Sequence, residues 1–291
     1  MKRRLLKFGI LGLLCALLLA GLNYQVLAQR SPDLTQQTWE LHQHDFPLAS
    51  PQLELAANAK VKGKWVTYGT LDNQPLKGYL ARPAGAKADL PGLLVFHEWW
   101  GLNDNIQKMT EKLAAEGYTA LALDLYGGQV AESPEKARAL MQAAIGNQRS
   151  FDSHVKQAYQ YLSTQKKASK IGTIGWCFGG TSSLNAALLL PQKIDATVIY
   201  YGSGIETNPD RLKTLTMPIL GIFGELDQSI PMEKIKQFES ALKATDKKVE
   251  IYVYPNADHA FANPSGTRYN QTAAEQAWSK TTAFLKQYLA P

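Results

Sequence analysis

A cysteine flanked by glycines is the feature of this sequence with the clearest chemical potential. In the stretch IGWCFGG, Gly175 and Gly179 each stand two residues from Cys177. Here an apolar run gives way to a helix-forming one, and glycines at these places relieve the clash between a strand and the helix that follows it directly. The positive end of the helix dipole favours the thiolate form of Cys177. The pattern therefore predicts a nucleophilic thiol, and the alternative is a buried, inert one.

A nucleophilic thiol needs a base and a carboxylate that orients the base. His259 is the only one of the five histidines downstream of Cys177, and it follows the last apolar run. The stretch GELDQSIP follows the preceding run and offers both Glu225 and Asp227. We choose Asp227 because it stands just before Pro231, which begins a predicted helix. Each residue alone has a structural alternative: Asp227 as the cap of the following helix and His259 as a surface loop residue. Their order after Cys177 favours a catalytic set instead.

Two backbone amides are candidates for holding the oxyanion that such an attack creates. One is the amide after the nucleophile, that of Phe178, and the other is that of Trp99 in the loop HEWWG after an early strand. His97 and Glu98 resemble the start of a zinc-protease motif, but the second histidine that the motif requires is replaced by Gly101. We therefore expect neither a metal nor an organic cofactor.

The elements that must position these residues alternate along the chain. Short apolar runs without polar alternation are typical of strands covered on both faces, and amphipathic helical segments separate them. The predicted strands are 92–96, 119–123, 170–174, 196–201, 219–223 and 249–253, preceded by a hairpin of 64–70 and 76–82. This pattern predicts an α/β fold with a mostly parallel central sheet and helices on both faces. An insertion at 127–148 is expected to be helical around 134–144.

The N-terminal residues predict a targeting segment. Four basic residues in the first seven are followed by 15 uncharged residues from Phe8 to Leu22 and then by small residues that a signal peptidase recognises. We expect 1–28 to be a cleaved signal peptide that directs the protein to the periplasm or outside the cell. The alternative is an uncleaved membrane anchor, although the apolar run is shorter than the ~20 residues that span a bilayer. A lipoprotein is disfavoured because bulky Leu14 precedes Cys15.

The composition of the remaining chain limits its domain organisation and the classes of partner that we expect. We expect a poorly ordered lead-in at 29–60 and one domain at 61–291. Removing residues 1–28 leaves 27 basic against 25 acidic residues, a balance of +2. No basic patch then suggests nucleic acid, and Cys177 is left as the only cysteine, so an intramolecular disulfide is excluded. We expect a monomer that acts on a small molecule and meets a membrane only through an uncleaved signal.

The motifs HEWWG, GWCFGG, GELD and DHAF together resemble the dienelactone hydrolases (carboxymethylenebutenolidases) over about residues 66–289. The resemblance implies an α/β-hydrolase fold with Cys177 as nucleophile and Asp227 and His259 as its partners. It also implies that Glu98 is the carboxylate that helps to generate the thiolate. The alternative for Glu98 is a residue that merely holds its loop.

One residue departs from the family pattern. Members that act on dienelactone carry an arginine four residues after the histidine, where this sequence has Asn263. The change weakens the case for an acidic lactone, and Arg138 in the inserted helix is a candidate for a compensating charge, or else an exposed helix arginine. An aromatic pocket is expected from residues that otherwise serve packing: Trp99, Trp100, Tyr126, Trp176, Phe178 and Phe261.

The leading hypothesis is an exported hydrolase that cleaves a small lactone or ester through a thioester of Cys177. Two alternatives stay open at this point. One is a non-catalytic small-molecule binding protein on the same fold, and the other is an acyltransferase that uses an alcohol in place of water.

Overall fold

The protein is described here from a computed structural model that covers residues 32–48, 60–86, 89–245 and 247–290. An eight-stranded sheet has the order β1-β2-β4-β3-β5-β6-β7-β8. β2 pairs antiparallel with β1 and β4, and the remaining pairs are parallel. The strands are β1 Val61–Leu71, β2 Gln74–Pro83, β3 Gly92–Phe96, β4 Thr119–Leu123, β5 Ile171–Trp176, β6 Ala196–Tyr200, β7 Ile219–Gly224 and β8 Val249–Tyr254. The predicted mostly parallel sheet is confirmed.

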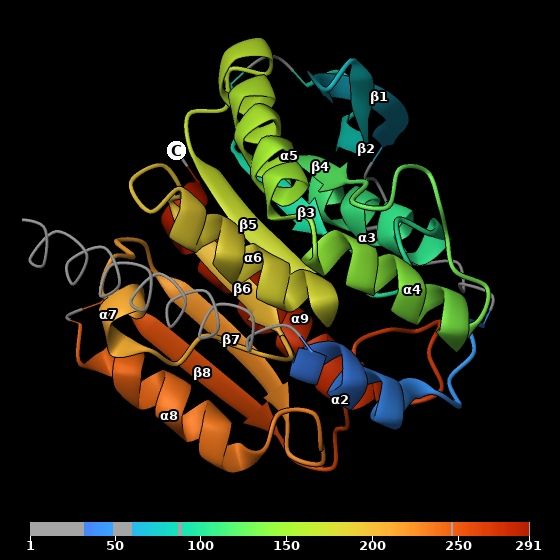
Figure 1. Cartoon of the computed structure of the whole chain (residues 1–291). Coiled ribbons are helices and arrows are strands. Elements are labelled where there is room, and N and C mark those ends of the chain that lie inside the picture. The colour runs from blue at the N-terminus through green and yellow to red at the C-terminus, as the bar shows by residue number, and fades with distance from the viewer. Residues whose placement is uncertain (1–31, 49–59, 87–88, 246, 291) are drawn as a thin grey trace, which may run out of the picture.

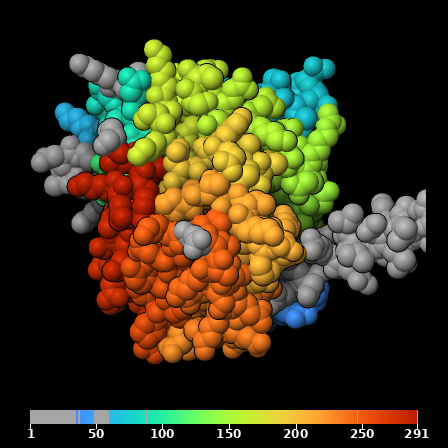
Figure 2. Space-filling view, turned by 90° about the vertical axis from the view of Figure 1, so that its left-hand side faces the viewer, coloured from blue at the N-terminus to red at the C-terminus, as the bar shows by residue number. Residues whose placement is uncertain are grey.

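Helices cover both faces of this sheet, with α6 in front of it and α9 behind it in Figure 1. They are α2 Pro32–His42, α3 Asp104–Ala115, α4 Pro134–Ile145, α5 Gln148–Gln160, α6 Phe178–Leu189, α7 Pro209–Leu212, α8 Met232–Lys243 and α9 Gln271–Leu289, with a π-helical turn, Tyr161–Gln165, after α5. Figure 2 shows one side of the molecule, where the orange residues around α8 lie beside the red residues of α9. Within the described ranges no helix has the length and apolarity to cross a membrane; the predicted signal, 1–28, lies outside those ranges.

The central strands are buried because both of their faces are covered. Every residue of β3 to β7 is buried, which explains why these segments carry apolar runs without polar alternation. β8 is only half-buried along most of its length and lies at the sheet edge, as Glu250 in this strand suggested. The core thus forms where the sequence is most continuously apolar.

The turn from β5 to α6 requires the two glycines that flank Cys177. Cys177 has φ 56° and ψ −121°, a strained conformation for a residue with a side chain. A Cβ atom on Gly175 would lie 2.1 Å from the carbonyl oxygen of Gly179, and one on Gly179 would lie 2.2 Å from that of Phe96. The strand, the helix and β3 therefore approach one another too closely for any other residue.

The expected poorly ordered lead-in, 29–60, is wrong for the part that is described. Residues 32–42 form the helix α2, and the chain continues from it to residue 48. α2 lies beside α4, the helix of the predicted insertion (Figure 1). Its order comes from contacts with distant residues, because the segment carries no apolar stripe that predicts a buried helix. Residues 49–59 lie outside the described ranges.

Candidate active site

Three of the predicted residues meet at the carboxyl edge of the sheet. Cys177 follows β5, Asp227 follows β7 and His259 follows β8, and each is only 3% exposed. The Nδ1 atom of His259 lies 2.8 Å from Oδ2 of Asp227. Cys177 and His259 line one small cavity together with Glu98. The topology therefore brings a thiol, an imidazole and two carboxylates into one buried cluster.

The electrostatics of His259 depend on both of its neighbours. Burial alone would lower the pKa of His259, but the Asp227 carboxylate and the Cys177 sulfur outweigh this effect and raise it well above the ordinary value. Burial alone would raise the pKa of Asp227, but the neighbouring His259 lowers it and holds the pKa of this carboxyl below its usual range. Asp227 engages Nδ1, whereas Nε2 has no hydrogen-bond partner among the described residues. Nε2 is therefore the ring atom left for proton exchange. Both neighbours therefore favour the protonated form of the ring.

Ser229 joins this pair, and sequence reasoning missed it. Its hydroxyl donates to Oδ1 of Asp227 at 2.5 Å and lies 2.8 Å from Nδ1 of His259, while its backbone N–H donates to the same carboxylate at 2.8 Å. The Asp-x-Ser spacing in GELDQS was the available signal, because an aspartate often accepts from the backbone two residues on. Glu225, the other candidate acid, is exposed and contacts the Asn256 amide instead. Asp227 is thus the carboxylate that orients the ring.

Glu98 is a second buried carboxyl group beside the thiol. Burial raises the pKa of Glu98 to about 7, although the His259 charge and a hydrogen bond from Asn263 oppose the shift. The Nδ2 atom of Asn263 donates to Oε2 of Glu98 at 2.5 Å, and Oε1 has no partner among the described residues. Ser265 donates to the Asn263 side-chain oxygen through both its amide and its hydroxyl, which fixes the orientation of this amide. A neutral donor therefore stands where dienelactone-type sequences carry an arginine.

The two expected oxyanion donors border the same cluster. Phe178 is the first residue of α6, so its N–H belongs to the turn that has no intrahelical acceptors. Trp99 follows Glu98 and packs its ring against that of Trp100, with 4.8 Å between the centroids. Both tryptophans line the small cavity.

Not all of the expected pocket residues reach this cavity. Arg138 donates to Gln36 at 2.7 Å and places its guanidinium over the Trp39 ring at 5.0 Å, so the expectation that it adds a charge to the site is corrected. Phe261 is fully buried and packs against Tyr201 and Tyr254 in the core, as the packing alternative predicted.

A cavity larger than the one beside the sulfur lies elsewhere in the described part of the chain. It has a volume of about 650 Å³ and lies between α4, α5 and α6, with Tyr126 and Phe178 in its wall. Cys177 and His259 do not line it, whereas the cavity that they do line has a volume of about 20 Å³. In the described part of the chain, no group of three or more His, Cys, Asp or Glu side chains is arranged to hold a metal ion.

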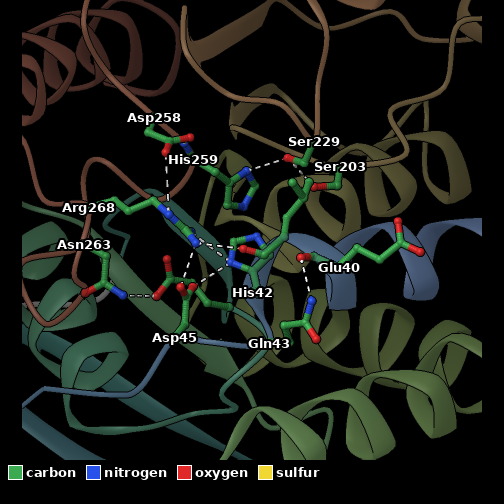
Figure 3. Close-up of polar contacts among 12 residues, drawn as sticks. Glu40, His42, Gln43, Asp45, Ser203, Ser229, Asp258, His259, Asn263 and Arg268 are labelled. Carbon is green, nitrogen blue, oxygen red and sulfur yellow. Dashed lines mark hydrogen bonds and ion pairs between the residues drawn. The ribbon is translucent and has the colours of Figure 1, made fainter.

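Residues from the N-terminal segment and from a late loop complete the small cavity. His42, Asp45 and Phe46 line it from one side and Arg268 from another. Nη2 of Arg268 lies 2.6 Å from Oδ1 of Asp45, and the ring centroids of His42 and His259 are 4.8 Å apart. Figure 3 shows Arg268 between Asp45 and Asp258, with His42 beside His259. Nothing in the local sequence pattern indicated these residues.

A nucleophile elbow, an acid and a histidine, in this chain order and at the ends of successive parallel strands, define the α/β-hydrolase class. Within that class the sequence profile of the dienelactone hydrolase family matches residues 76–289. The chain belongs to the dienelactone hydrolase family and is a carboxylic ester hydrolase.

Known relatives agree with this assignment. "Protein usf" of Aquifex pyrophilus is 34% identical over 221 residues, which are 74% of this chain and 94% of the relative. A protein of Aquifex aeolicus named "Putative carboxymethylenebutenolidase" is 32% identical over 225 residues, with the same coverage of both chains. The crystal structure of a "Putative Dienelactone Hydrolase" from Klebsiella pneumoniae is similar with a TM-score of 0.70 and 26% identity, and covers 79% of this chain and all of that one.

Proposed function

We propose that this hydrolase is exported and cleaves a small lactone or carboxylic ester with Cys177 as nucleophile, through a thioester intermediate. The observation that carries the proposal is the position of His259. Its Nδ1 atom contacts the Asp227 carboxylate, its ring lines the same small cavity as Cys177, and both neighbours raise its pKa. An imidazolium beside the sulfur stabilises a thiolate, which is the attacking form of cysteine.

The reaction proceeds in two halves. In the first, the thiolate forms a bond to the carbonyl carbon, and the oxygen of the carbonyl takes up the negative charge and accepts hydrogen bonds from the Phe178 and Trp99 amides. The carbon–oxygen single bond of the ester then breaks, and His259 gives its proton to the leaving alkoxide. In the second half, His259 takes a proton from water, the hydroxide attacks the thioester, and the carboxylic acid leaves while the thiolate is restored.

Glu98 is suited to a role before the attack. Its pKa of about 7 lets it gain or lose a proton near neutral pH, and Oε1 is left without a partner among the described residues. A carboxylate in this place accepts the thiol proton when substrate displaces the present contacts. The hydrogen bond from Asn263 fixes the position of Glu98 without adding a positive charge.

The test of the nucleophile compares Cys177→Ala and Cys177→Ser with the parent protein on a panel of lactones and short-chain esters. We expect kcat/KM to fall by on the order of 10³-fold or more in Cys177→Ala, because the covalent pathway is lost. Mass spectrometry of the parent protein, quenched during turnover, should show the acyl group on Cys177. Equal turnover by the parent and the alanine variant would remove Cys177 from the mechanism and favour the non-catalytic role of this site.

The same assay separates hydrolysis from acyl transfer. Turnover in the presence of an added alcohol should yield mainly the free acid if water is the acceptor. A new ester as the main product would assign the chain to acyl transfer.

A further inference from the structure

The cavity beside Cys177 is too small for any ester substrate. Its volume of about 20 Å³ is room for about one water molecule. Pockets that bind small molecules have volumes of roughly 300–1,000 Å³. Part of the wall comes from His42, Asp45 and Phe46, which precede the sheet in the chain and do not belong to the matched family region. We call residues 32–48 the strap.

The strap places a side chain directly over the catalytic histidine. His42 is 2% exposed. Its ring packs edge-on against His259 with 4.8 Å between the centroids and is tilted against Trp99 with 5.3 Å between the centroids. Burial lowers the pKa of His42 to about 4, so the ring is neutral at neutral pH and packs beside the charged His259 without repelling it. The groups that face His42 are Asp45 at 2.7 Å and Arg268 at 3.0 Å, both on its Nδ1 atom.

Three separate attachments hold the strap down. On α4, Arg138 contacts Gln36 and Trp39. In the loop after the catalytic histidine, Arg268 binds the side chain of Asp45 and the carbonyl oxygen of Leu41, at 2.6 and 2.9 Å.

At the end of the strap, the Leu48 amide donates to the Ser265 carbonyl at 3.0 Å. Contacts between partly exposed charged and aromatic groups are individually weak. The strap therefore detaches far more easily than the sheet beneath it unfolds.

We propose that the strap closes the substrate cleft over Cys177, and that substrate reaches the sulfur only when the strap lifts from Trp99, His259 and Arg268. The inference rests on the proposed function in taking Cys177 as the attacking atom. It explains why Cys177, His259 and Asp227 are all buried at 3% exposure in an enzyme whose substrate comes from solution. The closed arrangement also protects the only thiol of the chain beyond residue 28 from other electrophiles and from oxidation.

The experiment measures how fast iodoacetamide alkylates Cys177. A Cys15→Ala background leaves one thiol in the full chain. In this background, Trp39→Ala removes the cation–π contact with Arg138 on α4, Asp45→Asn weakens the attachment to Arg268, and the double variant combines the two changes. Matched controls are Trp278→Ala, which removes a cation–π pair between α9 and Lys112 on α3, and Asp72→Asn, which removes an ion pair with Arg149.

We expect each strap variant to raise the second-order alkylation rate about fivefold, which corresponds to about 1 kcal/mol in the opening equilibrium. The controls should leave the rate unchanged. Asp45 also acts on the pKa of Glu98, so acceleration by Asp45→Asn alone would be an electrostatic effect and would overturn the proposal. Acceleration by Trp39→Ala, whose side chain touches no group of the catalytic cluster, supports lifting of the strap.

Hydrogen exchange of residues 35–48 shows whether the strap has lifted. Faster exchange in the double variant together with an unchanged alkylation rate would overturn the proposal, because a free strap would then not control access. An unchanged exchange rate in the double variant would also overturn the proposal, because it would show that these attachments do not hold the strap in place. Alkylation does not require turnover, so the strap is tested even if Cys177→Ala retains full esterase activity and the proposed function fails.

Discussion

At the scale of single residues, the site combines a charged pair with a neutral one. Asp227 and His259 share a strong ionic contact, whereas Glu98 is held by the uncharged amide of Asn263. Burial favours the protonated form of a carboxyl group, and for Glu98 it outweighs the opposing His259 charge and Asn263 hydrogen bond, which is why the pKa rises to about 7. Burial, the His259 charge and a neutral donor thus set the protonation of Glu98 in this chain.

Replacing Glu98 by Gln tests this description through stability. The pKa of Glu98 is 4.5 in the unfolded chain and about 7 in the folded protein. At a pH between these two values, the unfolded chain has released the Glu98 proton while the folded protein keeps it. The contribution of Glu98 to stability is therefore complete below pH 4.5 and is lost as the pH rises through 7, a total of about 3 kcal/mol. Glu98→Gln cannot ionise, so its free energy of unfolding should gain about this amount relative to the parent protein over that range.

Urea unfolding of both proteins at pH 4.5 and pH 7.5 measures the difference. Glutamine still offers an oxygen to Asn263, so the hydrogen bond is kept in the variant. Parallel stability curves for the two proteins would show that Glu98 has the same pKa when folded and unfolded.

At the scale of elements, the elbow between β5 and α6 decides where the thiol lies. The N-terminus of α6 sits against the end of β3, and a Cβ atom on Gly179 would come within 2.2 Å of the Phe96 oxygen and 2.6 Å of the His97 oxygen. Both of these are backbone atoms of the segment that carries Glu98 and Trp99. A shift of α6 therefore separates Cys177 from Glu98 and from the expected oxyanion donor Trp99 at the same time.

Gly179→Ala should accordingly destabilise the fold by about 1–3 kcal/mol, as overpacking in a rigid core does, and should reduce ester turnover beyond the loss of folded protein. Gly146→Ala is the control, because that glycine has φ −70° and its added Cβ would meet nothing closer than 3.2 Å. Chemical unfolding with turnover per folded molecule measures both effects. A fully stable and active Gly179→Ala protein would contradict the close approach of α6 and β3.

At the scale of the whole molecule, the strap begins at residue 32, shortly after the proposed export signal, residues 1–28. Cleavage after Ala28 would leave Gln29 as the first residue and would keep all of the strap, residues 32–48. We therefore expect the exported protein to retain the segment that covers its cleft.

Intact-mass measurement of the protein recovered from the periplasm or the medium should give a chain that starts at Gln29. A chain that retains residues 1–28 and fractionates with the membrane would instead support the uncleaved anchor. A mature chain that starts beyond residue 48 would show that processing removes the strap as well.

The sequence by itself determined the sheet, the elbow and the chain order of the candidate catalytic residues. Each of these depends on local periodicity or short spacing: apolar runs mark the buried strands, and the glycines around Cys177 mark a turn that no larger residue allows. It also indicated that Asn263 departs from the family pattern.

Only the tertiary structure showed Asp227 in contact with His259 and Glu225 exposed. It also removed Arg138 and Phe261 from the expected pocket, and joined Asn263 to Glu98 across 165 positions of the chain. It also placed the strap over the site, through contacts such as that of Arg268 with His42, which are 226 positions apart. Pairings of this kind leave no periodic pattern in the sequence, because they depend on how folded elements pack and not on the residues next to them in the chain.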